Sequence, residues 1–266
     1  MNNNMSVPAI EFRKVDKRFA ASGRNPEVLA ATQVSFSIAV GEVVSIIGPS
    51  GCGKSTLLNM GAGLAKVSAG EVLVQGEIVT GPNSHVAFML QKDLLMPWRT
   101  IAQNVEFGLE LRGVKAAERA KVSQRLLTEC RLTGFGNNYP HQLSGGMRQR
   151  AALARTLAVD PLVLLMDEPF SALDAQTKMI LQQDLARTVH EEGKTVLFIT
   201  HDLAEAVALS DRILVMSERP GTIVEEIKVN IPERENPMHR RKHADVGAYV
   251  GRLMELLKLD DHTEVH

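Results

Sequence analysis

The nonapeptide GPSGCGKST, residues 48–56, restricts the fold of this chain more than any other segment. It matches the pattern G-x-x-x-x-G-K-[ST] and lies between the apolar run VVSII and a stretch with helical periodicity. Glycines at the start of a helix expose backbone N–H groups that attract phosphate. A glycine-rich turn that matches by chance would need neither a strand before it nor a helix after it. The segment therefore predicts a phosphate-binding loop in an α/β fold.

The side chains of this loop have separate expected tasks. Lys54 should reach the β- and γ-phosphates of a nucleotide, and Ser55 should ligate Mg²⁺. Cys52 lies near the start of the helix, where a thiolate is stabilised, so its environment favours a reactive thiol without implying catalysis. The residues expected to bind the nucleotide are Gly48, Pro49, Ser50, Gly51, Cys52, Gly53, Lys54, Ser55 and Thr56.

Strand-length apolar runs alternate with helical stretches in the second half of the chain. Strands are predicted over residues 162–167, 195–200 and 212–217, and helices over 177–193 and 202–209. The run LVLLMD is apolar until it ends in acid, as in a strand that is buried on both faces. This alternation predicts an α/β protein with a mostly parallel sheet.

The first half of the chain indicates two subdomains. Strands are expected over residues 9–15, 34–40 and 42–47, with a loop over 20–27 and a hairpin over 70–79. These strands predict an N-terminal antiparallel β-subdomain. Helical periodicity over 101–157 indicates an inserted α-helical subdomain of about residues 92–157. We expect one domain over 8–230, followed by a tail over 231–266 with one helix.

Charge and cysteine content exclude several classes of protein. Thirty basic and thirty-one acidic residues give a net charge of −1, which argues against a nucleic-acid-binding protein. Two cysteines form neither a disulfide framework nor a metal-ligand pattern, as in a reducing compartment. The N-terminus lacks an apolar signal core, and no apolar run approaches the ~18 residues of a membrane helix. We expect a soluble chain that reaches a membrane only through a partner.

Asp167 ends the run LVLLMD and Glu168 follows it, at the sheet edge where ligands of open α/β folds bind. Asp167 should hold Mg²⁺, directly or through water. Glu168 would then lie beside the γ-phosphate and polarise the attacking water as a general base. The alternative is a pair of acids that form only surface ion pairs, and the phosphate-binding loop makes that interpretation the weaker one.

A second glycine-rich helix start, LSGG at residues 143–146, has two interpretations. In the structural one, Ser144 caps a helix and the glycines allow close packing. In the functional one, the segment is a second phosphate cradle, which implies a second nucleotide or a second chain because one nucleotide needs only one cradle. A head-to-tail homodimer would place Ser144, Gly145 and Gly146 of one chain against the γ-phosphate held by Lys54 of the other.

Five ordered motifs make the chain resemble the ATP-binding subunits of ABC transporters over about residues 8–230. They are GPSGCGKST, the glutamine of MLQKD, LSGGMRQR, LLMDEP with SALD, and the histidine of ITHD. The resemblance implies an ATPase that uses Mg²⁺ and whose LSGG segment binds the ATP of a partner chain. It also implies an integral membrane permease and, indirectly, a periplasmic or extracellular solute-binding protein. The chain would then lie at the cytoplasmic face of the membrane.

The resemblance assigns roles to single residues. Gln91 would sense Mg²⁺ and the attacking water and border the permease, and His201 would contact the γ-phosphate. Asp174 would cross the dimer interface, a role that is compatible with capping a helix. Phe19 stands where the family has an aromatic ring that stacks on adenine. The alternatives are a polar strand end for Gln91, a structural histidine, and a core aromatic for Phe19.

The segment KDLLMPWRT after Gln91 places large apolar side chains in a loop around Pro97. They are Leu94, Leu95, Met96 and Trp98. An apolar cluster at a surface indicates a partner, and the resemblance implies that the permease docks here. The alternative is that these side chains cap the helical subdomain.

Longer segments resemble one group of importers, those for nitrate, sulfonate and taurine. They are LQKDLLMPWRTIAQNVEFGLELRGV and ERPGTIVEEIKVNIP. The rival classes are a soluble ABC ATPase of DNA repair or translation, an ABC exporter ATPase and a P-loop kinase. Two positions depart from expectation: Met147 stands where the family often has glutamine, and Gly61 interrupts a helix. The basic run HRRKH, residues 239–243, predicts a solvated face of the tail, with a lipid or partner contact as the alternative.

Overall fold

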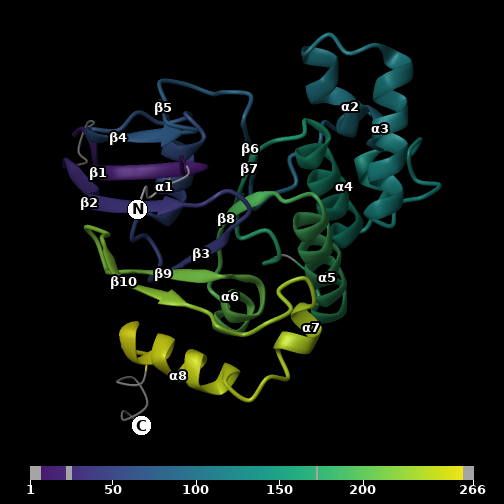
Figure 1. The fold of residues 1–266 in the computed structure, drawn as a ribbon. Coiled ribbons are helices and arrows are strands. Elements are labelled where there is room, and N and C mark those ends of the chain that lie inside the picture. The colour runs from purple at the N-terminus through teal and green to yellow at the C-terminus, as the bar shows by residue number, and fades with distance from the viewer. Residues whose placement is uncertain (1–6, 22–25, 172, 260–266) are drawn as a thin grey trace, which may run out of the picture.

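The computed structural model describes residues 7–21, 26–171 and 173–259. Two sheets and their covering helices make up the fold (Figure 1). The strands are β1 (Ile10–Phe19), β2 (Val28–Ile38), β3 (Val43–Ile47), β4 (Ala69–Val74), β5 (Glu77–Ile78), β6 (Val86–Met89), β7 (Val163–Asp167), β8 (Thr195–Ile199), β9 (Arg212–Met216) and β10 (Ile223–Lys228). The helices are α1 (Lys54–Gly61), α2 (Ile101–Leu111), α3 (Ala116–Glu129), α4 (Gly145–Ala158), α5 (Ala175–Glu191), α6 (Leu203–Leu209), α7 (Pro237–Arg240) and α8 (Val246–Leu256).

The larger sheet has six strands in the order β10-β9-β3-β8-β7-β6. Its pairing is parallel from β9 to β6, and β10 runs antiparallel to β9. β3 and β8 are buried along their whole length, as their continuous apolar sequences predicted. Because parallel strands end at the same edge of a sheet, the end of β3 before α1 and the end of β7 at Asp167 meet there.

The smaller sheet contains the antiparallel strands β2-β1-β4-β5. The predicted antiparallel β-subdomain is therefore confirmed, including the hairpin, but β1 and β2 extend beyond the strands expected from the sequence. Lys14 and Gln33 have positive φ angles of 46° and 47°, beside shifts in the register between β1 and β2. Such irregularities interrupt the two-residue alternation by which a strand is recognised. Residues 22–25 of the expected loop lie outside the described part of the chain.

The inserted helical subdomain is formed by α2 and α3, which pack on α4 (Figure 1). A capping box starts α2, because the side chain of Thr100 accepts from the Gln103 backbone and the side chain of Gln103 accepts from the Thr100 backbone. Strands β6 and β10 were not expected from the sequence. The first has only four residues, and the second is an edge strand, IVEEIK, in which two adjacent glutamates break the alternation of apolar and polar residues.

The described part of the tail, residues 231–259, contains two helices, α7 and α8, so the prediction of a single helix is wrong. Arg240, in the basic run, is 1% exposed and donates to the carbonyl oxygens of Ala208 and Ser210 at the end of α6. The expected solvated face is therefore wrong for this residue, because the last carbonyls of a helix need donors. Lys242 and His243 are exposed as expected. Residues 260–266 lie outside the described part of the chain.

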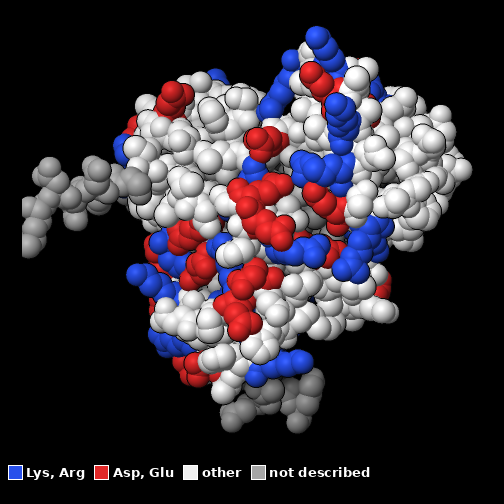
Figure 2. All heavy atoms as spheres, turned by 45° about the vertical axis from the view of Figure 1, so that its right-hand side comes forward, with Lys and Arg blue, Asp and Glu red and all other residues white. Residues whose placement is uncertain are grey.

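The surface carries charges of both signs. Figure 2 shows carboxylates gathered at the centre of one face, with Lys and Arg side chains around them. That face offers no continuous basic surface for a nucleic-acid backbone. Among the described residues, none of the helices has both the length and the apolar character needed to cross a bilayer.

Candidate functional site

The phosphate-binding loop connects β3 to α1. The ammonium group of Lys54 donates to the carbonyl oxygens of Gly48 and Pro49, at 2.7 and 2.8 Å. Gly51 has a φ of 76°, a backbone conformation that favours glycine. The side chain of Cys52 is 1% exposed and faces into the fold. The prediction of a reactive thiol is therefore wrong, because the buried sulfur is out of reach of a reagent in solvent.

A cleft opens over this loop and is bordered by residues from three other segments. Its lining includes Ser50, Ser55, Thr56, Phe19, Glu168 and Arg219. Phe19, the last residue of β1, is 47% exposed, so the alternative of a core aromatic is wrong. The ammonium group of Lys17 lies 5.0 Å from the centre of the Phe19 ring, on one of its faces. The aromatic ring of Phe19 therefore forms part of the apolar lining of the cleft.

Asp167 lies beside the loop at the end of β7. Burial raises the pKa of Asp167 above its ordinary value, and the Glu168 charge adds to this, whereas a hydrogen bond from Ser55 and the Lys54 charge lower it. The hydroxyl of Ser55 and the carboxylate of Asp167 thus form a pair of neighbouring oxygen donors. Such a pair fits Mg²⁺, which takes one or two protein oxygens and completes its shell with phosphate and water. The described residues contain no cluster of three acidic, His or Cys side chains for a metal held by protein alone.

Glu168 is the meeting point of three segments. Its Oε2 accepts a hydrogen bond from Nε2 of Gln91 at 3.1 Å and lies 3.4 Å from Nδ1 of His201. Gln91 also donates to the hydroxyl of Ser171 at 3.3 Å, and this hydroxyl donates to the backbone oxygen of Glu168. Glu168 has a φ of 47°, a conformation that is uncommon outside glycine. Its described side-chain partners are thus an amide and an imidazole at the cleft.

His201 follows β8 and is positioned by the residue after it. Its side chain is 67% exposed, so the alternative of a packed structural histidine is wrong. Asp202 caps α6 and pairs with Lys178 of α5 at 2.8 Å. Lys178 also pairs with Glu205 at 2.7 Å, and the Glu205 side chain is 2% exposed. This ion-pair cluster ties the start of α6, and with it His201, to α5.

Ser144 caps α4, as its structural interpretation predicted, and its hydroxyl accepts from the backbone N–H of Met147 at 3.3 Å. A Cβ added at Gly146 would lie 2.6 Å from the methyl carbon of Thr177, so glycine allows α4 to approach the start of α5. Asp174 caps α5 by accepting from the backbone N–H of Thr177 at 2.9 Å, and these contacts lower the pKa of Asp174. The residues that lead to this cap include Ala172, which lies outside the described part of the chain.

The motif that leads into this cap is SALD, residues 171–174, and its Ser171 lines the same groove as Gly145 of the second glycine-rich helix start. Gly145 lines a groove together with Gln91, Arg148 and His201. By contrast, residues 144–146 are not among the described residues that line the cleft over the phosphate-binding loop. The two glycine-rich helix starts therefore line different hollows of one chain, and Glu168 lies in the lining of both. Met147 packs against the core below α4, where a side chain without polar groups fits.

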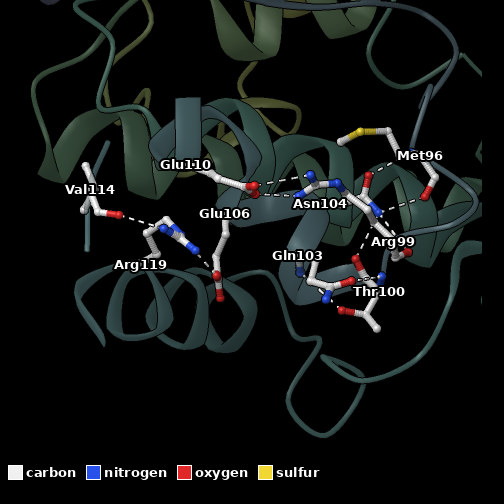
Figure 3. A network of polar contacts seen from close by, with 9 residues as sticks. All are labelled: Met96, Arg99, Thr100, Gln103, Asn104, Glu106, Glu110, Val114 and Arg119. Carbon is white, nitrogen blue, oxygen red and sulfur yellow. Dashed lines mark hydrogen bonds and ion pairs between the residues drawn. The ribbon is translucent and has the colours of Figure 1, made fainter. Parts of the chain in front are cut away.

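The segment after Gln91 is held in place by two helices. Asn104 of α2 is fully buried, donates to the carbonyl oxygens of Met96, Arg99 and Thr100, and accepts from the N–H of Met96 (Figure 3). From α4, Arg155 donates to the carbonyl oxygen of Leu94 at 2.7 Å. A buried amide with four hydrogen bonds fixes the backbone on which the neighbouring side chains stand.

The four apolar side chains of this segment do not share one environment. Leu94 is 55% exposed and Trp98 is 73% exposed, and Met96 is partly buried. Leu95 is 7% exposed and belongs to the core cluster that includes Met89 and Ile101. The prediction that Leu95 contacts a partner is therefore wrong, because its side chain points into the helical subdomain. For Leu95 alone, the alternative that the side chain packs onto the helical subdomain is correct.

Two residues at the site were not singled out from the sequence. Ser171 contacts Gln91 and belongs to the SALD motif, so a signal for it existed. Arg219 lines the cleft over the phosphate-binding loop, but no pattern in the sequence marks it. Its position depends on a turn that approaches the loop only in the folded chain.

The fold and the site together define a class of protein. A phosphate-binding loop between β3 and α1, acids at the end of β7, and a helical subdomain inserted between them are the parts of a P-loop ATPase of the cassette type. The profile of the ABC transporter family matches residues 31–171. The chain belongs to this family and is an ATP-hydrolysing transport ATPase.

Named relatives and solved structures agree with this assignment. The taurine import ATP-binding protein TauB of Yersinia pestis bv. Antiqua is 45% identical over 205 residues, which cover 77% of this chain and 80% of that protein. The nitrate import ATP-binding protein NrtD of Synechocystis sp. is 45% identical over 219 residues, 82% of each chain. A dimeric ATP-binding cassette, solved in a post-hydrolysis state bound to ADP and Pi, has a TM-score of 0.74 and 34% identity. The similarity covers 83% of this chain and 99% of that one.

Proposed function

We propose that this chain is the ATP-hydrolysing subunit of an ABC importer. The observation that carries the proposal is the convergence of Gln91, Glu168 and His201, from three separate segments, beside the cleft over the phosphate-binding loop. Each residue follows a strand of the larger sheet or ends one, so the sheet holds all three at a single edge. An acid, an amide and an imidazole at that position suit attack of water on a γ-phosphate.

Each residue of the site has a proposed task. The backbone of residues 48–56 cradles the phosphates, and Lys54 neutralises the β- and γ-phosphates. Ser55, Asp167 and Gln91 would hold Mg²⁺, which would supply positive charge to offset that of the phosphates. Glu168 accepts the proton of the attacking water, and His201 donates a hydrogen bond to the γ-phosphate. Phe19 stacks on the adenine.

The proposed assembly is a head-to-tail homodimer. Ser144, Gly145 and Gly146 of one chain face the γ-phosphate that Lys54 of the other chain holds, and Asp174 crosses the interface. Support comes from the separate placement of the second helix start and the first loop within one chain, and from the dimeric form of a related cassette. Two-fold symmetry then produces two identical composite sites.

A crosslink tests this arrangement directly. The Ser50→Cys and Ser144→Cys variant, made without the two native cysteines, is trapped with ATP and treated with a short bismaleimide. We expect a covalent dimer on a denaturing gel, whose yield falls sharply when ATP is omitted. A crosslink formed only within one chain would exclude the composite site.

The proposed partner is a membrane permease that docks on the exposed side chains of Leu94 and Trp98 and on the partly buried Met96. The permease holds the subunit at the cytoplasmic face of the membrane and receives solute from a binding protein on the other side. Relatives that are named for taurine and nitrate import favour a small anionic or zwitterionic solute. The alternatives are an exporter ATPase and a soluble ABC ATPase of DNA repair or translation. The mixed charges in Figure 2 disfavour the nucleic-acid partner of the latter.

Reconstitution tests the importer proposal. The chain is purified with a candidate permease and placed in proteoliposomes with a candidate solute-binding protein. ATP-dependent accumulation of labelled taurine or nitrate would support import. Movement of solute only from the side that holds the ATPase to the side that holds the binding protein would instead support an exporter.

A further inference from the structure

Arg219 contacts the phosphate-binding loop from a part of the chain 168 residues away. It belongs to the turn at residues 217–222 between β9 and β10. Two nitrogens of its guanidinium, Nε and a terminal one, donate to the carbonyl oxygen of Gly51 at 3.1 and 2.9 Å. Hydrogen bonds from a charged donor are stronger than those between neutral groups. Arg219 therefore holds the loop at Gly51.

The turn that carries Arg219 is itself well supported. The backbone of Ser217 donates to the carbonyl oxygen of Thr222 at 3.0 Å, and the backbone N–H of Thr222 donates to the Ser217 hydroxyl at 3.1 Å. Gly221 donates to the carbonyl oxygen of Ala30 at 3.0 Å and accepts from the N–H of Thr32 at 3.0 Å. The turn is thus closed on itself and attached to β2.

A second contact joins the turn to the loop. A Cβ added at Gly221 would lie 2.0 Å from the carbonyl oxygen of Cys52 and 2.6 Å from the terminal methyl group of Met216. The backbone of the turn therefore rests directly on the backbone of the loop, with no room for a side chain between them. This contact is independent of the guanidinium of Arg219.

The contact of Arg219 differs from that of Lys54, the other cation at the loop. Lys54 donates to Gly48 and Pro49, and a bound phosphate competes for the same ammonium group. Arg219 uses a different carbonyl, that of Gly51, so its hydrogen bonds can persist while Lys54 turns to phosphate. Only one of the two cations needs to change partners when nucleotide binds.

We propose that the turn from Ser217 to Thr222 braces the phosphate-binding loop and that Arg219 is a positioning residue which sets the affinity for nucleotide. The inference rests on the proposal that residues 48–56 hold the phosphates. Without the brace, part of the loop is ordered only when nucleotide binds, which weakens binding. The chemical step is preserved in bound nucleotide, because Glu168 and His201 lie on other segments.

Arg219→Ala tests the brace by calorimetric titration with ADP and by steady-state ATP hydrolysis. We expect Kd for ADP and KM for ATP to rise about tenfold, as for a lost charged hydrogen bond, while kcat stays within about twofold. Arg219→Lys keeps a cationic donor and should recover part of the affinity. Arg252→Ala removes an exposed arginine from α8 and should change neither constant.

Lys54→Ala shows whether a negative result counts against the brace or against the proposed phosphate site. If Lys54→Ala binds ADP as tightly as the unchanged chain, residues 48–56 do not hold the phosphates and the proposed site itself is wrong. If Lys54→Ala loses ADP but Arg219→Ala keeps full affinity, the site stands and the brace is wrong. A fall in kcat without a rise in KM, or no recovery by Arg219→Lys, would also overturn the positioning role.

Discussion

Oε2 of Glu168 lies 3.4 Å from Nδ1 of His201, although the two residues follow different strands of the larger sheet. The same oxygen accepts a hydrogen bond from Gln91. The sheet edge thus holds the carboxylate between an amide and an imidazole, at the mouth of the cleft over the phosphate-binding loop. If this carboxylate is the general base, a substitution that keeps its size but removes its basic oxygen should stop catalysis and leave the geometry of the site unchanged.

Glu168→Gln should lower phosphate release by about 100-fold or more, because the amide keeps the size of the side chain but cannot accept a proton. ATP should still bind, and the ATP-bound variant should elute as a dimer in size-exclusion chromatography. Glu255→Gln, an exposed change on α8, is the matched control and should keep full activity. Turnover of Glu168→Gln near that of the control would rule out the role of general base.

Asp167→Asn should separate folding from Mg²⁺ binding. Burial raises the pKa of Asp167, so the fold holds the ionised form of this carboxylate at a cost in free energy. The neutral amide avoids this cost, and the thermal midpoint in EDTA should rise. Mg²⁺-dependent hydrolysis should fall by about 100-fold or more, because an amide is a poor ligand for Mg²⁺. A lower midpoint in EDTA than that of the exposed control Asp245→Asn would contradict the expectation.

Leu95→Ala and Leu94→Ala, at neighbouring positions, should have different effects on stability. Leu95 is buried in the core, so its truncation should cost about 2–4 kcal/mol in the free energy of unfolding. Leu94 is 55% exposed, and its truncation should change the stability by less than about 0.5 kcal/mol. Urea unfolding at equilibrium measures both values. Equal losses of stability in the two variants would show that the buried side chain of Leu95 contributes no more to the free energy of unfolding than the exposed side chain of Leu94.

Leu94→Ala combined with Trp98→Ala should weaken docking of the permease and leave the ATPase intact. The pair removes exposed apolar area and a tryptophan, which is a frequent anchor of interfaces. Recovery of the permease in a pull-down from detergent should fall, while basal hydrolysis by the isolated subunit stays within about twofold. Leu111→Ala, at a side chain that is 73% exposed on α2, is the control. Normal recovery of the permease would place the docking surface elsewhere.

Lys178→Met should destabilise the fold in a way that depends on pH. Burial disfavours the charge of Lys178 but its ion pairs outweigh this and raise its pKa, while the same pairing outweighs burial and lowers the pKa of Asp202. The Asp202 contribution is present above its unfolded pKa of about 4 and is lost as pH falls through the lower folded pKa. The Lys178 contribution is present below its unfolded pKa of about 10 and is lost as pH rises through the higher folded pKa.

The substitution should therefore cost about 3 kcal/mol near neutral pH, where Glu205 is left buried without its cation, and less in strong acid. Urea unfolding of Lys178→Met and of the exposed control Lys242→Met, each near neutral pH and in strong acid, measures how this cost changes with pH. A penalty for Lys178→Met that does not shrink in acid would show that lost packing, and not the ion pairs, accounts for it.

The sequence predicted those residues whose structural role depends only on the local backbone conformation. The loop at residues 48–56, the cap at Ser144 and the acid at the end of β7 each depend on neighbours within a few positions. Burial was less predictable. Leu95 and Trp98 stand three positions apart in one apolar segment, yet one is 7% exposed and the other 73%. A loop has no periodicity from which to infer the direction of a side chain.

Local sequence was sufficient for the class of fold and for the positions of the phosphate-binding loop and the terminal acid of β7, because strand and helix patterns and helix caps are short-range. Contacts between distant segments decided the rest. A Cβ at Gly61 would lie 3.2 Å from side chains of both Ile10 and Leu165, which explains a glycine that helix propensity disfavours. Arg219 reaches Gly51 only because β9 and β3 pair in the larger sheet. Such contacts bring together residues far apart in the chain, and no pattern within a short window can encode which of them will meet.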